Sequence, residues 1–181
     1  MIYLFLAEGF EETEALVPLD ILRRANIEIK TVGISNKTVI GAHNIPVTAD
    51  LSENEITFEN LSGIILPGGM PGTLNLEKSD IVQKAIDYAN KNSLLISAIC
   101  AAPSILGHKG LLNGIKATCF TGFEKDLLGA TVLDMPVVSD KNYITAYGAG
   151  AAFEFGFKIL EYLKDADFTD NLKKSMRYIG E

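Results

Sequence analysis

The chain has 181 residues, which is the length of one domain with room for a hydrophobic core. Its formal net charge of −7 argues against nucleic acid or an anionic membrane surface as the main partner. The hydrophobic fraction of 48% and the charged fraction of 22% are typical of a globular domain, and no apolar run approaches the roughly 20 residues that cross a bilayer.

Short apolar runs alternate with amphipathic ones in the first half of the chain. The first run, IYLFLA at 2–7, predicts a fully buried strand. The next segment, 12–25, predicts a helix with Leu16, Leu19 and Leu22 on one face. The remaining predictions in this half are a strand over 27–34, a hairpin over 38–50 around Gly41 and Asn44, and a strand over 61–66 that ends in a Gly/Pro loop.

The second half continues the same alternation. Its clearest helix signal is 79–92, where Ser79 is a suitable cap and Ile81, Ala85 and Tyr88 share a face. The other predicted elements are a buried strand over 94–99, a short helix within 101–110, strands over 117–121 and 143–147, a helix over 150–166 and a last helix over about 169–178.

Continuous apolar strands separated by helices imply a mostly parallel sheet that is covered on both faces. No linker, charge run or repeat marks a boundary, so we expect residues 1–181 to form one domain. Ligands of such sheets bind at the carboxyl ends of the strands. Three loops fall there: AEGFEETE after the first strand, PGGMPG after Leu66, and the turn at Cys100.

The cysteine content and the N-terminal sequence suggest a compartment. Cys100 and Cys119 are too few for a disulfide scaffold. The start, MIYLFLAEGFEE, lacks a basic leader, and its apolar run is too short for a signal peptide. We therefore expect a cytoplasmic protein.

Cys100 lies where a buried strand meets a short helix. The backbone must bend sharply there, and free N–H groups at the helix start favour an anion. We therefore expect the Cys100 thiol to ionise easily and to be reactive. The alternative is a buried, inert cysteine, which is common, and that is the role we expect for Cys119 in its predicted strand.

Backbone N–H groups in two loops are placed to act with Cys100. Gly69, in LPGGMPG, and Ala101, after the cysteine, are candidate donors to an oxyanion that develops over the sulfur. A plain tight turn is the competing interpretation of the Gly-rich loop.

Glu14 differs from the other acids of EGFEETE because of Pro18. Proline lacks the N–H that would bond the Glu14 carbonyl, so we expect the regular helix to begin near Ala15 and to leave Glu14 at its edge. If Glu14 meets Cys100, the two acids titrate as a pair and share a proton, because adjacent anions are costly. Glu14 is then a candidate general acid or base.

Four segments together resemble the ThiJ/PfpI superfamily, and most closely its parkinsonism-associated protein deglycase branch. They are AEGFEETEALVPLDILRRA, IILPGGMPG, AICAAPSIL and YGAGAAFEFGFKILE, spread over nearly the whole chain in the family's order. The resemblance implies a flavodoxin-like three-layer α/β/α sandwich with a nucleophile elbow, usually as a homodimer. It also implies that Cys100 is the nucleophile, Glu14 its carboxyl partner, and Gly69 and Ala101 the backbone donors.

The resemblance identifies the residues of the site more specifically than it identifies the reaction. Family members are credited with glutathione-independent glyoxalase activity, deglycation of methylglyoxal adducts, chaperoning, and oxidative-stress sensing through a cysteine sulfinic acid. We therefore expect a cofactor-independent, cysteine-dependent stress protein that acts on small reactive carbonyls or glycated adducts. The alternatives are a redox sensor or chaperone without dedicated catalysis, and a family member with another biosynthetic or hydrolytic substrate.

The sequence departs from the family pattern at several positions. Phe120 stands where some members have a histidine, and Tyr147 where many have an arginine. Ala101 replaces the histidine that follows the cysteine in the protease-like branch, and a late His-x-Glu pair is missing, so peptidase and glutamine amidotransferase activities are disfavoured. His43, in the predicted hairpin, is a candidate to reach Cys100 of a partner subunit. No His or Cys spacing fits a zinc site, and we expect no metal or organic cofactor.

Overall fold

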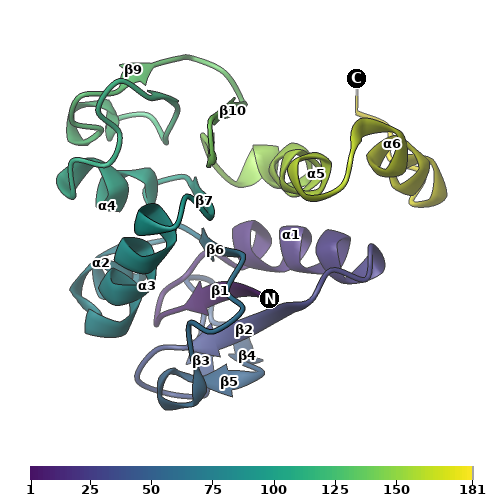
Figure 1. Cartoon of the computed structure of the whole chain (residues 1–181). Coiled ribbons are helices and arrows are strands. Elements are labelled where there is room, and N and C mark those ends of the chain that lie inside the picture. The colour runs from purple at the N-terminus through teal and green to yellow at the C-terminus, as the bar shows by residue number, and fades with distance from the viewer. Residues whose placement is uncertain (181) are drawn as a thin grey trace.

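A seven-stranded sheet forms the middle layer of the computed structural model, which describes residues 1–180 (Figure 1). The strand order is β10-β11-β7-β6-β1-β2-β5, and every neighbouring pair is parallel except β10 with β11. The strands are β1 (Ile2–Leu6), β2 (Ile29–Gly33), β5 (Leu51–Ser52), β6 (Gly63–Leu66), β7 (Leu95–Ile99), β10 (Val137–Asp140) and β11 (Tyr143–Ala146).

Helices cover both faces of this sheet, so the predicted α/β/α sandwich is confirmed. Helices α2, α3 and α4 lie on one side, and α1, α5 and α6 lie on the other (Figure 1). The helices are α1 (Glu12–Arg24), α2 (Gly72–Lys78), α3 (Asp80–Lys91), α4 (Pro103–His108), α5 (Ala152–Leu163) and α6 (Ala166–Ser175). None of the helices within residues 1–180 is long and apolar enough to cross a bilayer.

The first strand shows why its sequence is continuously apolar. Tyr3 and Phe5 belong to the hydrophobic cluster on the α3 side, whereas Leu4 and Leu6 belong to the cluster that contains α1 and α5. Successive side chains of a strand point to opposite faces, so a strand with two covered faces needs apolar residues throughout.

Smaller elements flank the main sheet. The predicted hairpin is present as the antiparallel pair β3 (Thr38–Ile40) and β4 (Pro46–Thr48). A separate parallel pair joins β8 (Lys116–Ala117) to β9 (Thr131–Val132). Three short 3-10 helices are η1 (Glu53–Glu55), η2 (Glu124–Asp126) and η3 (Ala149–Ala151).

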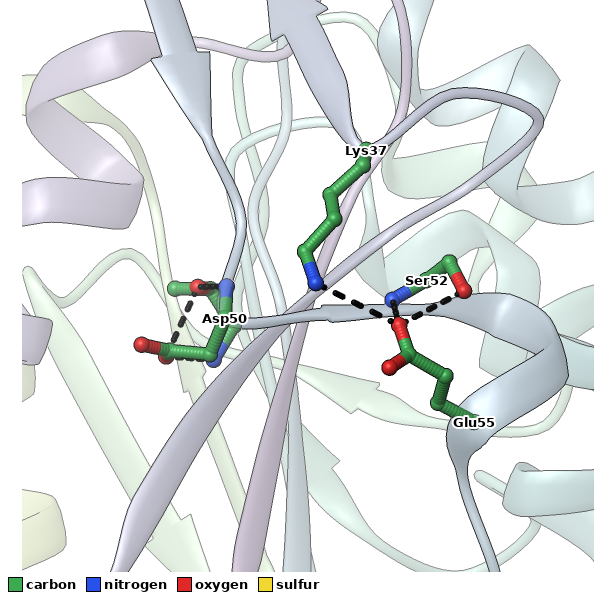
Figure 2. A network of polar contacts seen from close by, with 5 residues as sticks. Lys37, Asp50, Ser52 and Glu55 are labelled. Atoms are coloured by element: carbon green, nitrogen blue, oxygen red, sulfur yellow. Dashed lines mark hydrogen bonds and ion pairs between the residues drawn. The ribbon is translucent and has the colours of Figure 1, made fainter.

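Two carboxylates fix the segment that carries the edge strand β5 (Figure 2). The Asp50 carboxylate accepts hydrogen bonds from the Thr31 N–H at 2.8 Å and from its hydroxyl at 2.9 Å. The Glu55 carboxylate accepts from the Ser52 N–H at 2.7 Å and from its hydroxyl at 2.8 Å, and lies 3.4 Å from Lys37 Nζ. These bonds hold β5 beside β2, although the two strands share a register of only two residue pairs.

Three sequence predictions differ from the structure. The strand predicted over 117–121 is wrong, because only Lys116 and Ala117 pair in a sheet and Phe120 lies in a turn. The last helix begins at Ala166, since the Asp165 carboxylate caps it by accepting from the Phe168 N–H at 2.7 Å. Helix α2 corresponds to the helix start that is one interpretation of the Gly/Pro loop, but its bounds were not predicted, because its residues lack a helical apolar pattern.

Candidate functional site

The turn at Cys100 has the sharp bend that the sequence predicts. Strand β7 ends at Ile99, and Cys100 adopts a φ of 65°, which is uncommon for a residue with a side chain. The Cys100 N–H donates to the Ala146 carbonyl at 2.9 Å, and the Cys100 carbonyl accepts from the Phe120 N–H at 2.8 Å. Two segments that are distant in sequence thus hold the strained residue in place.

Both predicted backbone donors reach the sulfur. The N–H groups of Ala101 and Gly69 lie near enough to the Cys100 side chain to lower the pKa of its thiol through hydrogen bonding. Gly69 has a φ of +87°, and a Cβ at this position would lie 2.5 Å from the Glu11 nitrogen and the Gly9 carbonyl oxygen. Only glycine therefore brings this N–H close to Cys100.

The Glu14 carboxyl lies beside the thiol, in a position that is 1% exposed. It accepts a hydrogen bond from the Gly68 N–H at 2.9 Å. The Cys100 side chain and the Ala149 N–H lie near enough to lower the pKa of this carboxyl through hydrogen bonding. A Cβ on Gly68 would stand 2.7 Å from both Cys100 Cβ and Glu14 Oε2. The missing side chain of Gly68 thus leaves the space in which thiol and carboxyl meet.

Helix α1 begins earlier than the sequence analysis predicts. Its first residue is Glu12, not Ala15, and Pro18 lies inside it. The reason is the Glu11 carboxylate, which caps the helix by accepting from the Glu14 N–H at 2.7 Å. Glu14 therefore sits in the first helical turn, where it still faces the loop after β6.

The pKa values of the pair follow from burial. Burial, with a smaller contribution from the nearby Glu11 charge, raises the pKa of the Glu14 carboxyl to about 7. Burial, together with the Glu14 charge, raises the pKa of the Cys100 thiol to about 12. The expectation that this turn makes the isolated thiol acidic is therefore wrong, because desolvation and Glu14 outweigh the N–H donors of Ala101 and Gly69.

The predicted sharing of a proton agrees with these shifts. A pair of this kind loses one proton near neutral pH and keeps the other to high pH. Above about pH 7 the site consequently holds one proton and one negative charge, which Glu14 and Cys100 share. Such a pair combines a nucleophile with an adjacent proton acceptor.

Cys119 differs from Cys100 in its surroundings. Its side chain is 6% exposed and belongs to the hydrophobic cluster on the α3 side of the sheet. Burial, followed by the charges of Glu124 and Asp126, raises the pKa of its thiol to about 11. The thiol is therefore protonated at neutral pH and has no carboxyl partner of the kind that Cys100 has in Glu14.

His43 faces a carboxylate of its own chain. Its Nδ1 lies 2.7 Å from Glu12 Oε2, and its N–H donates to Glu12 Oε1 at 2.7 Å. Hydrogen bonding to Glu12 raises the pKa of His43, whose side chain is 69% exposed. The expected reach of His43 into a partner's site stays a prediction. Glu12 could not be predicted as the partner of His43, because only the packing of the hairpin on α1 brings the two residues together.

Glu11, Glu12 and His43 also form a group of metal-ligating types. One ligand atom of each lies within 4.8 Å of the other two. The Glu12 oxygens already accept hydrogen bonds from His43, and the Glu11 carboxylate caps α1. These internal bonds account for the arrangement.

A groove of about 900 Å³ lies elsewhere, at the carboxyl ends of β1 and β2. Neither Cys100 nor Glu14 lines it. Its lining is largely polar and includes Glu8, Ser35, Asn36, Asn75, Lys78 and Lys84. The chemistry of the thiol and carboxyl is therefore separate from this groove.

Comparison with known proteins gives consistent matches over almost the whole chain. The family described as "DJ-1/PfpI family" matches residues 1–162. "Protein dj-1beta" of Drosophila melanogaster is 31% identical over 174 residues, which cover 94% of this chain and 93% of that protein. "Glutathione-independent glyoxalase DJR-1.2" of Caenorhabditis elegans is 31% identical over 171 residues, which cover 93% of this chain and 91% of that protein. The solved structure "Toxoplasma gondii DJ-1, oxidized" superposes with a TM-score of 0.94 at 27% identity, covering 99% of this chain and 98% of its own.

Proposed function

The chain belongs to the DJ-1/PfpI family, and from this premise we propose that it is a cysteine-dependent protein that converts small α-oxoaldehydes to 2-hydroxy acids. The observation that carries the proposal is the contact of one thiol with one buried carboxyl and two backbone N–H donors. That set supplies a nucleophile, a proton carrier and an oxyanion site at one point.

The first step is addition of Cys100 to the aldehyde. The sulfur forms a bond to the aldehyde carbon while the C=O π electrons move to the oxygen. The thiol proton passes to the Glu14 carboxylate, and the N–H groups of Gly69 and Ala101, which point at the sulfur, donate to the new oxyanion. Glu14 then returns the proton to that oxygen and leaves a neutral hemithioacetal.

The second step moves hydrogen within the substrate. Glu14 removes the proton from the former aldehyde carbon and returns it to the neighbouring ketone carbon through an enediol, while the hydroxyl proton of the first carbon passes to the ketone oxygen. The first carbon is thereby oxidised to a thioester and the second is reduced to an alcohol. Water then cleaves the thioester, releases a 2-hydroxy acid and restores the thiol. The net reaction converts the α-oxoaldehyde and one water molecule to the 2-hydroxy acid, and it needs no external oxidant or reductant.

The C. elegans relative whose name describes a glutathione-independent glyoxalase supports this reaction class for the present chain. The shared site also supports action on glycated adducts, because a hemiaminal or hemithioacetal adduct releases the same carbonyl to the same thiol.

Product analysis tests the proposal directly. The purified protein should convert methylglyoxal to lactate in the absence of glutathione, and proton NMR measures the lactate formed. In D₂O, deuterium should enter the carbon next to the carboxylate if Glu14 exchanges its proton during the transfer. Lactate formation no faster than in a protein-free control would reject the proposed reaction.

A second candidate function is redox sensing by the same thiol. Cys100 is half-buried and held next to Glu14, which can hydrogen-bond an oxidised sulfur. A solved relative at 27% identity is described as oxidized, which supports this alternative. Mild peroxide followed by peptide mass analysis should add two oxygens at Cys100 before other sites. Oxidation of other residues while Cys100 stays a thiol would exclude the sensor.

We further propose that the protein acts as a cytoplasmic homodimer, as the family resemblance implies. Ile45, which is 49% exposed at the end of the hairpin loop, lies close in sequence to His43. The hairpin is the element that we expect at the dimer contact.

A further inference from the structure

The residues around the elbow point to the chemical class of the substrate. The Phe120 N–H donates a hydrogen bond of 2.8 Å to the Cys100 carbonyl, so the backbone of Phe120 lies beside the elbow. Tyr147 directly follows Ala146, whose carbonyl accepts the Cys100 N–H. Aromatic residues thus flank both backbone contacts of the reactive residue.

The Phe120 ring is not part of the core. It is 50% exposed, although it belongs to a segment whose neighbours Thr118 and Cys119 are buried. The ring lies against Gly148, where an added Cβ would stand 3.2 Å from Cδ2 and 3.7 Å from Cε2 of Phe120. Because Gly148 has no side chain, the ring rests on the backbone of the turn that precedes η3.

The same turn serves the reacting groups. Ala149, which follows Gly148, has an N–H near enough to the Glu14 carboxyl to lower its pKa through hydrogen bonding. One short segment therefore positions the proton carrier through its N–H group and supports the exposed phenyl ring through its glycine.

We infer that Phe120 forms an apolar subsite for the substituent of the α-oxoaldehyde, and that the preferred substrates carry an aryl or bulky apolar group rather than a methyl group or a sugar chain. The inference rests on the proposed function and adds the substrate class. A phenyl ring offers dispersion and ring-stacking contacts but no hydrogen bond. An aryl substituent covers the exposed ring, whereas a polyhydroxylated chain would lose water without gaining a partner.

Steady-state kinetics with phenylglyoxal, methylglyoxal and 3-deoxyglucosone test the inference. The kcat/KM for phenylglyoxal should exceed that for methylglyoxal by about tenfold, the discrimination typical of an apolar pocket. Phe120→Ala should remove most of this ratio by lowering the kcat/KM for phenylglyoxal. Leu128→Ala is the matched control, since Leu128 is 53% exposed on the same connecting segment.

Two results would overturn the inference. One is an unchanged substrate ratio in Phe120→Ala, and the other is an equal loss for all substrates, which is what a purely structural role gives. Phe120→Leu, which keeps apolar bulk without a ring, should give an intermediate ratio, and it decides the matter if the alanine variant does not fold.

A second readout separates this inference from the proposed function. If the wild-type protein turns over none of the aldehydes, the proposed function fails, and alkylation of Cys100 then tests the subsite alone. N-benzyl iodoacetamide should alkylate Cys100 faster than iodoacetamide does, as measured by peptide mass analysis. Phe120→Ala should abolish this difference in rate. Equal rate ratios in the two proteins would reject the subsite.

Discussion

At the scale of single residues, Glu14 determines the charge of the site. Its carboxyl is buried, and burial alone would keep it protonated through most of the acidic range. Three donors offset part of that cost, namely the N–H groups of Gly68 and Ala149 and the Cys100 thiol. The result is a carboxyl with a pKa of about 7, which accepts and releases a proton under ordinary conditions.

This pKa predicts how stability depends on pH. The folded pKa of Glu14 lies above its ordinary value of 4.5, so the folded state binds the proton more tightly than the unfolded state between pH 4.5 and about 7. The free energy of unfolding should therefore fall as the pH rises through this window, on the order of 3 kcal/mol from this group. Urea unfolding at several pH values measures it.

Glu14→Gln should remove that part of the pH dependence and stabilise the protein at pH 7, because a neutral amide replaces a buried charge. Glu8→Gln is the control, since Glu8 is an exposed acid on the same loop. Parallel stability curves for wild type and Glu14→Gln would contradict the assigned pKa shift.

Glu11 tunes the same carboxyl. Its charge raises the pKa of Glu14, and its side chain caps α1 at the Glu14 N–H. We expect kcat/KM to rise with pH through an apparent pKa near 7, because the Glu14 carboxylate must accept the thiol proton. Glu11→Gln keeps a capping oxygen but loses the charge, so it should shift this rise to lower pH. A profile that coincides with that of wild type would show that Glu11 acts only as a cap.

At the scale of elements, sequence pattern and structure agree where burial is continuous. Strands β1, β6 and β7 were predictable because both of their faces are covered, so their residues are almost all apolar and no charged residue interrupts them. In the segment 117–121 only Ala117 pairs in a sheet, together with Lys116 before it. Thr118 donates its N–H to the Thr145 hydroxyl instead. A local sequence pattern could not predict this contact, because the two residues are far apart in the sequence.

The hairpin of β3 and β4 depends on one glycine for its position on α1. A Cβ on Gly41 would lie 2.3 Å from Glu12 Oε1, and that carboxylate is held by His43. Gly41→Ala should force Glu12 out of its buried position and lower the free energy of unfolding by about 1–3 kcal/mol. Hydrogen exchange should become faster across 38–48.

Gly150→Ala is the matched control for that change, because a Cβ at Gly150 meets no atom within 4 Å. Equal stability of the two variants would show that the contact between Glu12 and the hairpin contributes little.

At the scale of the whole molecule, the sequence pattern predicted the sandwich and three loops at one edge of its sheet, and the family resemblance implied that Cys100, Glu14, Gly69 and Ala101 meet there. That was possible because parallel strands place their following loops at one edge of the sheet. The direction of the Cys100 pKa shift was not predictable, because the helix-terminus argument is local. Desolvation of the thiol depends on α1 and on the turn after β11, which are far away in sequence.

The assembly is a prediction at this scale. Sedimentation velocity should give twice the mass of the chain. Ile45→Asp should shift the protein toward the monomer, because a charge on the hairpin would be buried at the expected contact. Leu128→Asp, at an exposed position outside the hairpin, should leave the mass unchanged. A wild-type monomer at micromolar concentration would contradict the proposed homodimer.

The central proposal is that the Cys100 sulfur, beside Glu14, is the reacting atom. The most direct test compares the rates at which two serine variants consume methylglyoxal. Cys100→Ser should abolish consumption of the aldehyde, whereas Cys119→Ser should keep most of it, because Cys119 is buried away from any carboxyl partner of this kind. Full consumption by folded Cys100→Ser protein would contradict the account.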